Sequence, residues 1–212
     1  RCKTAGQIDE ERLLRTAQPS RRERRLHRAS HMVITALAEL LEDAPGFPPE
    51  IAIVGTTSGG MSFGENFYRK LGNGNGCSAA LIANYPPQKQ IVDAMEKFGI
   101  NVPAEVIANA CASGTNAIGH AFNAIRAGRY QRILAGGYDA LSELVFVGFD
   151  SLQAATPDKC RPFDSNRSGM VLGEGAALFA LEELESARSR GAEILGEIIS
   201  YGISTDNHHL TQ

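Results

Sequence analysis

Three short apolar runs constrain the fold of this chain most. Each run is continuous rather than alternating with polar residues, which is typical of strands that are buried on both faces of a parallel sheet. Helical patterns lie between and after the first two runs. One ends at Leu71, one extends from about Gln88 to Phe98, and one extends from Ile118 to Ile125 and stops at Gly128. The runs are Ile51–Gly55, Val106–Ala108 and Gln131–Gly137. Strands that alternate with helices predict an α/β fold with a mostly parallel sheet covered by helices.

The flanking segments complete the predicted organisation. Residues 1–20 hold few apolar residues and are expected to be irregular, and the basic run 21–28 leads into a helix with Met32, Leu37, Leu40 and Leu41 on its apolar side. Beyond residue 168 we expect a long apolar strand to Leu181, a charged helix over 182–190 and a last strand over 194–203. We therefore divide the chain into a leading segment, 1–50, and a folded part, 51–212.

Composition narrows the class of protein. The 212 residues are 43% hydrophobic with a formal net charge of −3, so a sizeable core is expected and a nucleic-acid partner is not. No apolar run approaches the length of a membrane span. The four cysteines form no CxxC pair and lack a histidine cluster, which predicts reduced thiols in a cytoplasmic protein, without a disulfide framework or a metal site.

Cys111 stands between a predicted strand and a predicted helix. At the positive end of a helix, free N–H groups and the helix dipole favour the thiolate. Small neighbours, Ala110, Ala112, Ser113 and Gly114, would let a substrate approach the sulfur. An arbitrary free cysteine is more often an inert buried residue, but this context favours a nucleophile.

Three further features keep two interpretations each. The glycine loop Gly55–Gly60 is either a phosphate cradle or, as we favour, a tight turn that lets another backbone come close. The basic run is a solvated helix face or a docking patch for an acidic partner. His208 and His209 lack a third metal ligand at suitable spacing, so a histidine that lines a pocket is favoured over a metal ligand.

Taken together, the motifs resemble the β-ketoacyl-acyl-carrier-protein synthases, the condensing enzymes of fatty-acid and polyketide assembly. They follow the family's order and spacing from about residue 51 to the end. The matching segments are Asn109–Gly114, Asn116–His120, Ala135–Gly137, Gly148–Phe149, Arg161–Asp164, Gly169–Gly175, Leu181–Glu183, Arg190–Ala192 and Ser204–Thr211.

The resemblance implies a fold and a chemistry. The fold is the thiolase-like layered α/β/α/β/α architecture, here mainly its N-terminal half. Cys111 becomes the acyl acceptor, and its backbone N–H contributes to an oxyanion hole. The implied reaction is a decarboxylative Claisen condensation of the Cys-bound acyl chain with a malonyl-carrier thioester. No cofactor is implied, because the substrates travel on the phosphopantetheine of an acyl carrier protein.

The resemblance also implies roles for other residues. His209 matches a histidine near the active-site entrance, Phe149 lies near the acyl pocket, and Ser58 replaces a bulky gate residue and so suggests a wider acyl channel. Arg24 and Arg25 match a basic helix that meets the acidic carrier protein. A further arginine expected after Gly148–Phe149 is missing, which favours a polyketide-type member. We expect a homodimer or a heterodimer with a sister subunit such as a chain-length factor, and no membrane or nucleic-acid partner.

One departure from the family stands out. In the family, two catalytic histidines, a lysine and a second oxyanion donor lie downstream of the position that matches Gln212. The chain is therefore expected to carry only the first part of the catalytic residues. Two alternatives therefore stay open. One is a truncated, non-catalytic module that binds acyl groups or carrier protein, with a structural Cys111. The other is a thiolase-fold hydrolase or acyltransferase that uses Cys111 without decarboxylation.

Overall fold

The computed structural model describes residues 3–11, 13, 19–21, 23–74, 76 and 78–205. The strands are β1 (Ala5–Gly6), β2 (Ile51–Gly55), β3 (Ala104–Ile107), β4 (Arg132–Asp139), β5 (Leu172–Gly173) and β6 (Gly175–Glu182). The α-helices are α2 (Arg28–Asp43), α3 (Met61–Gly72), α4 (Ala79–Ala83), α5 (Lys89–Lys97), α6 (Ser113–Arg126), α7 (Glu143–Ser151) and α8 (Leu184–Ser189). Two 3-10 turns, η1 (Glu23–Arg25) and η2 (Ala110–Ala112), precede α2 and α6.

A four-stranded sheet with the order β3-β2-β4-β6 forms the centre of the molecule. β2 pairs in parallel with both β3 and β4, and β6 runs antiparallel to β4. The three runs that open the sequence argument are thus adjacent strands. The prediction of a mostly parallel sheet covered by helices is confirmed, with β6 as its antiparallel member.

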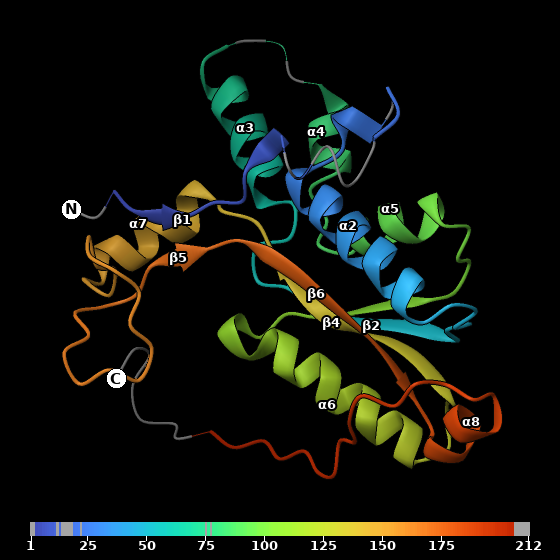
Figure 1. Cartoon of the computed structure of the whole chain (residues 1–212). Coiled ribbons are helices and arrows are strands. Elements are labelled where there is room, and N and C mark those ends of the chain that lie inside the picture. Colours follow the sequence, from blue (N-terminus) through green and yellow to red (C-terminus); the bar gives the residue numbers. More distant parts are fainter. Residues whose placement is uncertain are drawn as a thin grey trace.

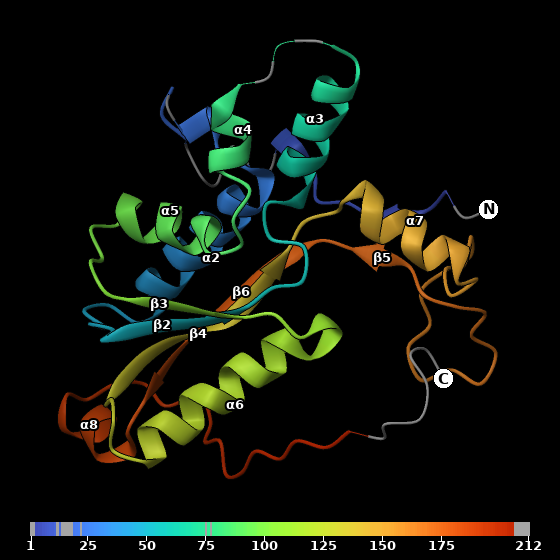
Figure 2. The ribbon, with the colours of Figure 1, turned by 180° about the vertical axis from the view of Figure 1, so that it is seen from behind.

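The sheet is covered on both faces (Figures 1 and 2). α2 and α5 lie on one face, where their apolar side chains form a core with Ala52 and Val54 of β2. α6 lies on the other face and packs against Ile51 and Ile53. Successive residues of a strand point to opposite faces, so a strand between two helical layers must be apolar at every position. This requirement explains the continuous run Ile51–Gly55.

Helix α2 carries the apolar side that its sequence predicts. Met32, Leu37 and Leu40 are buried, and Leu41 packs partly against the same core. The His27 side chain caps the helix by accepting a hydrogen bond from the Ala29 amide. Each fully buried leucine contributes on the order of 2 kcal/mol through removal of apolar surface from water, so α2 is held by tertiary packing.

A partly buried ion pair connects the N-terminal segment to this core. Arg28 Nε donates to both carboxylate oxygens of Glu174, at 2.8 and 3.0 Å, and the Ile8 amide donates to the same carboxylate at 2.9 Å. Burial alone would raise the pKa of Glu174, but the hydrogen bonds from Arg28 and Ile8 lower it below its usual value. Next to this pair, β1 pairs in parallel with β5, which places a short strand in a segment predicted to be irregular.

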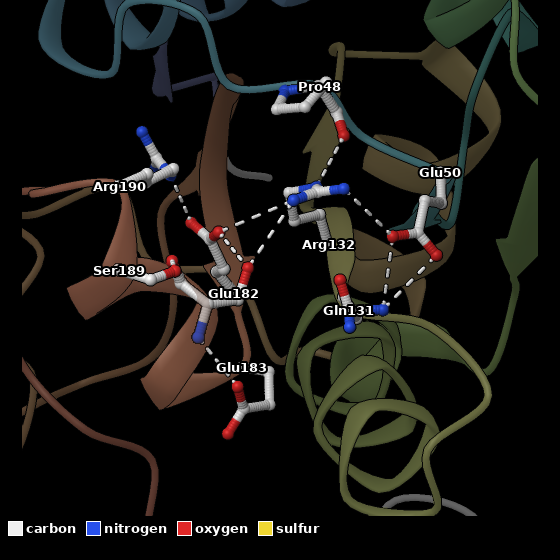
Figure 3. A network of polar contacts seen from close by, with 9 residues as sticks. Pro48, Glu50, Gln131, Arg132, Glu182, Glu183, Ser189 and Arg190 are labelled. Carbon is white, nitrogen blue, oxygen red and sulfur yellow. Dashed lines mark hydrogen bonds and ion pairs between the residues drawn. The ribbon is translucent and has the colours of Figure 1, made fainter.

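A second polar network joins β4 and β6 at the end of the sheet where β4 begins (Figure 3). The Arg132 guanidinium lies 3.7 Å from Glu50 and 4.0 Å from Glu182, and its Nε donates to the Pro48 carbonyl at 3.2 Å. Arg190 Nε donates to the buried Glu182 carboxylate at 2.8 Å. The network stabilises this end of the sheet, and the glycine loop that follows β2 lies at the opposite end.

The predicted last strand over residues 194–203 is wrong. No strand is assigned there, and Leu195 and Ile199 are 91% and 83% exposed. A strand forms only where another strand offers a free ladder of N–H and C=O groups, and this segment instead runs along α6 (Figure 1). Its Tyr201 hydroxyl donates to Asn116 Oδ1 at 2.6 Å.

Candidate active site around Cys111

Cys111 lies in η2, between the end of β3 and the start of α6. The residue is exposed and its thiol is free. The predicted strand–turn–helix around the cysteine is therefore confirmed as structure, and the buried, inert alternative does not fit an exposed side chain. Figures 1 and 2 both show the N-terminal end of α6 pointing to the side of the molecule that carries α7.

Close backbone contacts set the position of this turn. A Cβ atom on Gly55, the last residue of β2, would lie 2.2 Å from the Ser113 carbonyl carbon and 2.4 Å from the Gly114 nitrogen. A Cβ atom on Gly137 of β4 would lie 3.2 Å from the Gly114 Cα. At Gly55 only a residue without a side chain lets the first turn of α6 rest on the strand, and at Gly137 a side chain would make a tight contact. The close-approach interpretation of the glycine loop is confirmed at Gly55.

The carboxylate of Asp139 organises the rest of the glycine loop. Asp139 ends β4, and its Oδ1 accepts hydrogen bonds from Thr56 Oγ1 at 2.9 Å, from the Thr57 amide at 2.9 Å and from the Ser58 amide at 2.7 Å. The Ser58 hydroxyl lies 2.8 Å from the same oxygen and 3.0 Å from the Ala140 carbonyl. Ser58 is therefore buried and engaged with β4, and its role at an acyl channel stays a prediction.

The residue before the cysteine has an unusual conformation. Ala110 has a φ of 54°, in the left-handed region that residues other than glycine rarely adopt. Its carbonyl accepts hydrogen bonds from Thr57 Oγ1 at 2.9 Å and from Ser113 Oγ at 2.6 Å. The Ser113 hydroxyl in turn accepts from the Asn109 amide at 2.9 Å. These contacts connect the glycine loop directly to the cysteine turn.

The other predicted site residues lie on separate elements. Phe149 is partly buried in α7, a helix that the Ser142 hydroxyl caps by accepting from the Val145 amide. Arg24 and Arg25 are exposed on η1. His209, like its neighbour His208, lies outside the described residues, as do Cys2 and Cys77. The described ones among these residues therefore lie on elements other than η2, which carries Cys111.

Sequence reasoning named Ser113 only as a small neighbour of the cysteine and missed Thr57 and Asp139, although one signal pointed to these last two. Polar side chains at the carboxyl ends of parallel strands gather at one edge of a sheet, where ligands usually bind. Thr57 follows β2 and Asp139 ends β4, so these two residues meet across 82 positions of sequence. Ser113 is the first residue of α6 and is almost fully buried.

Two features are not found within the described part of the chain. Those residues contain no group of three or more histidine, cysteine, aspartate or glutamate side chains that could hold a metal ion. No helix among them is long and apolar enough to cross a membrane.

Comparison with known proteins decides the family. A family model described as beta-ketoacyl synthase, N-terminal domain, matches residues 4–187. The chain belongs to the beta-ketoacyl synthase family. This confirms the resemblance carried by the motifs around Cys111. The chain spans half or less of the length of the curated relatives it matches.

Individual relatives of this beta-ketoacyl synthase chain agree with the assignment. The 3-oxoacyl-[acyl-carrier-protein] synthase 2 of Staphylococcus aureus is 31% identical over 202 residues, which cover 89% of this chain and 50% of that protein. A beta-ketoacyl synthase from Burkholderia phymatum STM815 matches with a TM-score of 0.78 at 30% identity, over 92% of this chain and 51% of that one. The ishigamide ketosynthase/chain length factor matches with a TM-score of 0.76 at 33% identity, over 87% and 48%. The predicted thiolase-like α/β fold is confirmed.

Proposed function

We propose that this chain is the Cys111-bearing part of a ketosynthase that condenses a Cys-bound acyl chain with a malonyl group carried on acyl carrier protein. The observation that carries the proposal is the exposed thiol of Cys111 just before α6, in a chain that belongs to the beta-ketoacyl synthase family. A relative of the chain is named a 3-oxoacyl-[acyl-carrier-protein] synthase, which supports the same substrate class.

The proposed reaction has two halves. In the first, the Cys111 thiolate attacks the carbonyl carbon of an acyl-carrier thioester, and an oxyanion forms. The oxyanion collapses, the bond to the carrier sulfur breaks, and the acyl group stays on the Cys111 sulfur. The carrier leaves as a thiolate, which takes up the proton that the Cys111 thiol released. In the second, a malonyl-carrier thioester loses carbon dioxide. The resulting carbanion attacks the acyl-Cys111 carbonyl, which gives a β-ketoacyl-carrier thioester and returns the Cys111 thiolate.

Mass spectrometry of the intact protein tests the first half. After incubation with an acyl-carrier thioester, we expect a mass increase of one acyl group, which disappears in Cys111→Ala. Cys160→Ala is the matched control, because Cys160 is the other free, exposed cysteine among the described residues, and this variant should still be acylated. Carrier binding without any adduct would replace our proposal with the non-catalytic binding module.

We also propose that Arg24 and Arg25 meet the acidic carrier protein. Both side chains are exposed on η1, and they lie in a basic run of a chain whose formal net charge is −3. Rim charges of this kind act mainly on the association rate and are screened by salt. The double variant Arg24→Glu/Arg25→Glu should weaken carrier binding several-fold at low salt. An unchanged affinity, or an equal loss in the control Arg126→Glu/Arg129→Glu on exposed residues of α6 and its end, would contradict the assignment.

The resemblance to a ketosynthase/chain length factor supports a two-subunit assembly. We propose that this chain pairs with itself or with a sister subunit. Sedimentation analysis of the protein alone and with a sister subunit distinguishes the two forms. A protein that stays monomeric alone and does not associate with a sister subunit would contradict the proposal.

A further inference from the structure

The carbonyl group next to the nucleophile is held in place from two sides. Thr57 Oγ1 donates to the Ala110 carbonyl at 2.9 Å, from the glycine loop, and Ser113 Oγ donates at 2.6 Å, from the first residue of α6. Ala110 has a φ of 54°. An alanine keeps this left-handed conformation only where its surroundings hold it there. The two hydroxyls provide part of this hold, beside the Ser113 amide, which also donates to the Ala110 carbonyl.

The hydrogen of the Ser113 hydroxyl has a defined direction. The Ser113 oxygen accepts the Asn109 N–H at 2.9 Å, so its single hydrogen is directed to Ala110. Ser113 is also only 3% exposed, which shields the contact from water. A serine hydroxyl that both accepts and donates in a buried place is fixed in rotation.

Thr57 is fixed through Asp139. The Thr57 amide donates to Asp139 Oδ1 at 2.9 Å, and the same oxygen accepts the Thr56 hydroxyl and the Ser58 amide. The carboxylate therefore holds the loop backbone on either side of Thr57. This leaves the Thr57 side chain directed across the loop to the cysteine turn.

The Ala110 carbonyl belongs to the same peptide unit as the Cys111 N–H. The unit is planar and trans, because no cis peptide occurs in the described chain, so the N–H points opposite to the C=O. Fixing the carbonyl against Thr57 and Ser113 thus turns the Cys111 N–H to the face that these hydroxyls leave free. Cys111 is exposed, so that face can receive a substrate oxygen.

We infer that Thr57 and Ser113 are positioning residues, which aim the Cys111 amide at the oxyanion formed when a thioester acylates the sulfur. The inference rests on the proposed function, since it assigns a task in acyl transfer to Cys111. A backbone N–H stabilises the oxyanion only if it is aimed before the reaction begins. Asp139 supports the arrangement through the loop backbone.

Two reactions of the same thiol test this role. Acylation by an acyl N-acetylcysteamine thioester passes through an oxyanion, whereas alkylation by iodoacetamide displaces iodide and forms none. In Thr57→Val the hydroxyl is lost with little change of shape, and Thr57 is exposed, so the fold should persist. We expect acylation of Cys111 to slow by about tenfold to a hundredfold, with alkylation changed less than twofold. Thr57→Ser keeps the hydroxyl and should restore acylation.

The other outcomes are equally informative. If both reactions slow equally in Thr57→Val, the hydroxyl supports only the access or the fold of the turn, and the inference is overturned. Unchanged acylation overturns it as well. If the wild-type thiol reacts with iodoacetamide but with neither this thioester nor an acyl-carrier thioester, the result contradicts the proposed function and therefore also the inference. Thermal melting of each variant verifies that the fold is retained.

Discussion

At the scale of single residues, His27 shows how a buried histidine serves structure. Its Nδ1 accepts the Ala29 amide at 3.0 Å, which caps α2, and its Nε2 lies 2.7 Å from Ser62 Oγ. The ring also packs edge-on against Phe63. An Nδ1 atom that accepts a hydrogen bond carries no proton, so the ring must be neutral and Nε2 must be the donor.

This arrangement predicts acid sensitivity. Burial, helped by the nearby His31, lowers the pKa of His27 from 6.5 to about 4. Between these pH values the unfolded chain binds a proton at His27 and the folded chain does not. The contribution of His27 to stability is therefore fully present above pH 6.5 and is lost as the pH falls to about 4. The loss from this residue should be about 3 kcal/mol.

Urea unfolding at pH 7 and pH 4.5 measures the effect. His27→Asn keeps a capping side chain but does not titrate, so its free energy of unfolding should fall much less between the two pH values. His31, whose pKa is also lowered by burial, remains in the variant and accounts for part of the residual loss. Equal losses in both proteins would show that His27 does not report the pH change.

At the scale of elements, the first turn of α6 meets the end of β2 through backbone atoms, beyond the apolar side chains that pack the rest of the helix on the sheet. A Cβ atom on Gly55 would lie within 2.4 Å of backbone atoms of Ser113 and Gly114. Such contacts cannot be relieved by a side-chain rotation, so a larger residue must move the helix that follows Cys111. Packing at Gly55 therefore links the stability of the sheet to the geometry of the candidate site.

The variant Gly55→Ala should lose about 1–3 kcal/mol of unfolding free energy, because the added methyl group overpacks the contact. It should also slow acylation of Cys111. Gly148→Ala is the control: a Cβ atom there meets nothing within 4 Å, and its helical position should gain up to about 1 kcal/mol. Thermal or urea unfolding compares the two, and a neutral Gly55→Ala would contradict the packing argument.

The elements also show why sequence reasoning succeeds in part. β2, α5 and α6 are predicted because a local pattern, a continuous apolar run or a helical period, matches their surroundings. α7 was not predicted, because apolar residues such as Leu144 and Val147 are exposed on it and hide its period. The strand over 194–203 fails since pairing depends on a distant partner. Thr57 and Asp139 escape for the same reason, because their contact is long-range.

At the scale of the whole molecule, the segment after α8 lies outside the sheet. It packs on α6 through Tyr201. The Tyr201 ring lies so close to Gly119 that a Cβ atom there would come within 2.2 Å of it, and the Tyr201 hydroxyl donates to Asn116. Its exposed residues Leu195 and Ile199 bury little apolar surface. Segments with few buried contacts open locally before the domain unfolds.

Removal of this contact should therefore act locally. In Tyr201→Ala we expect limited proteolysis within residues 192–205 to become several-fold faster, while the urea midpoint of the whole protein changes little. Tyr68→Ala, at an exposed position of α3, is the matched control. If cleavage in this segment is no faster than in the control, Tyr201 does not hold the segment on α6.

Peptide mapping after incubation with an acyl-carrier thioester tests the central claim most directly, because it identifies the atom that receives the acyl group. Trypsin should release Cys111 within residues 98–126 and Cys160 within residues 160–167. Our account predicts the acyl mass on the first peptide, with fragmentation that places it on Cys111, and an unmodified second peptide. An acyl group on Cys160, or an adduct on neither peptide while the carrier binds, would contradict it.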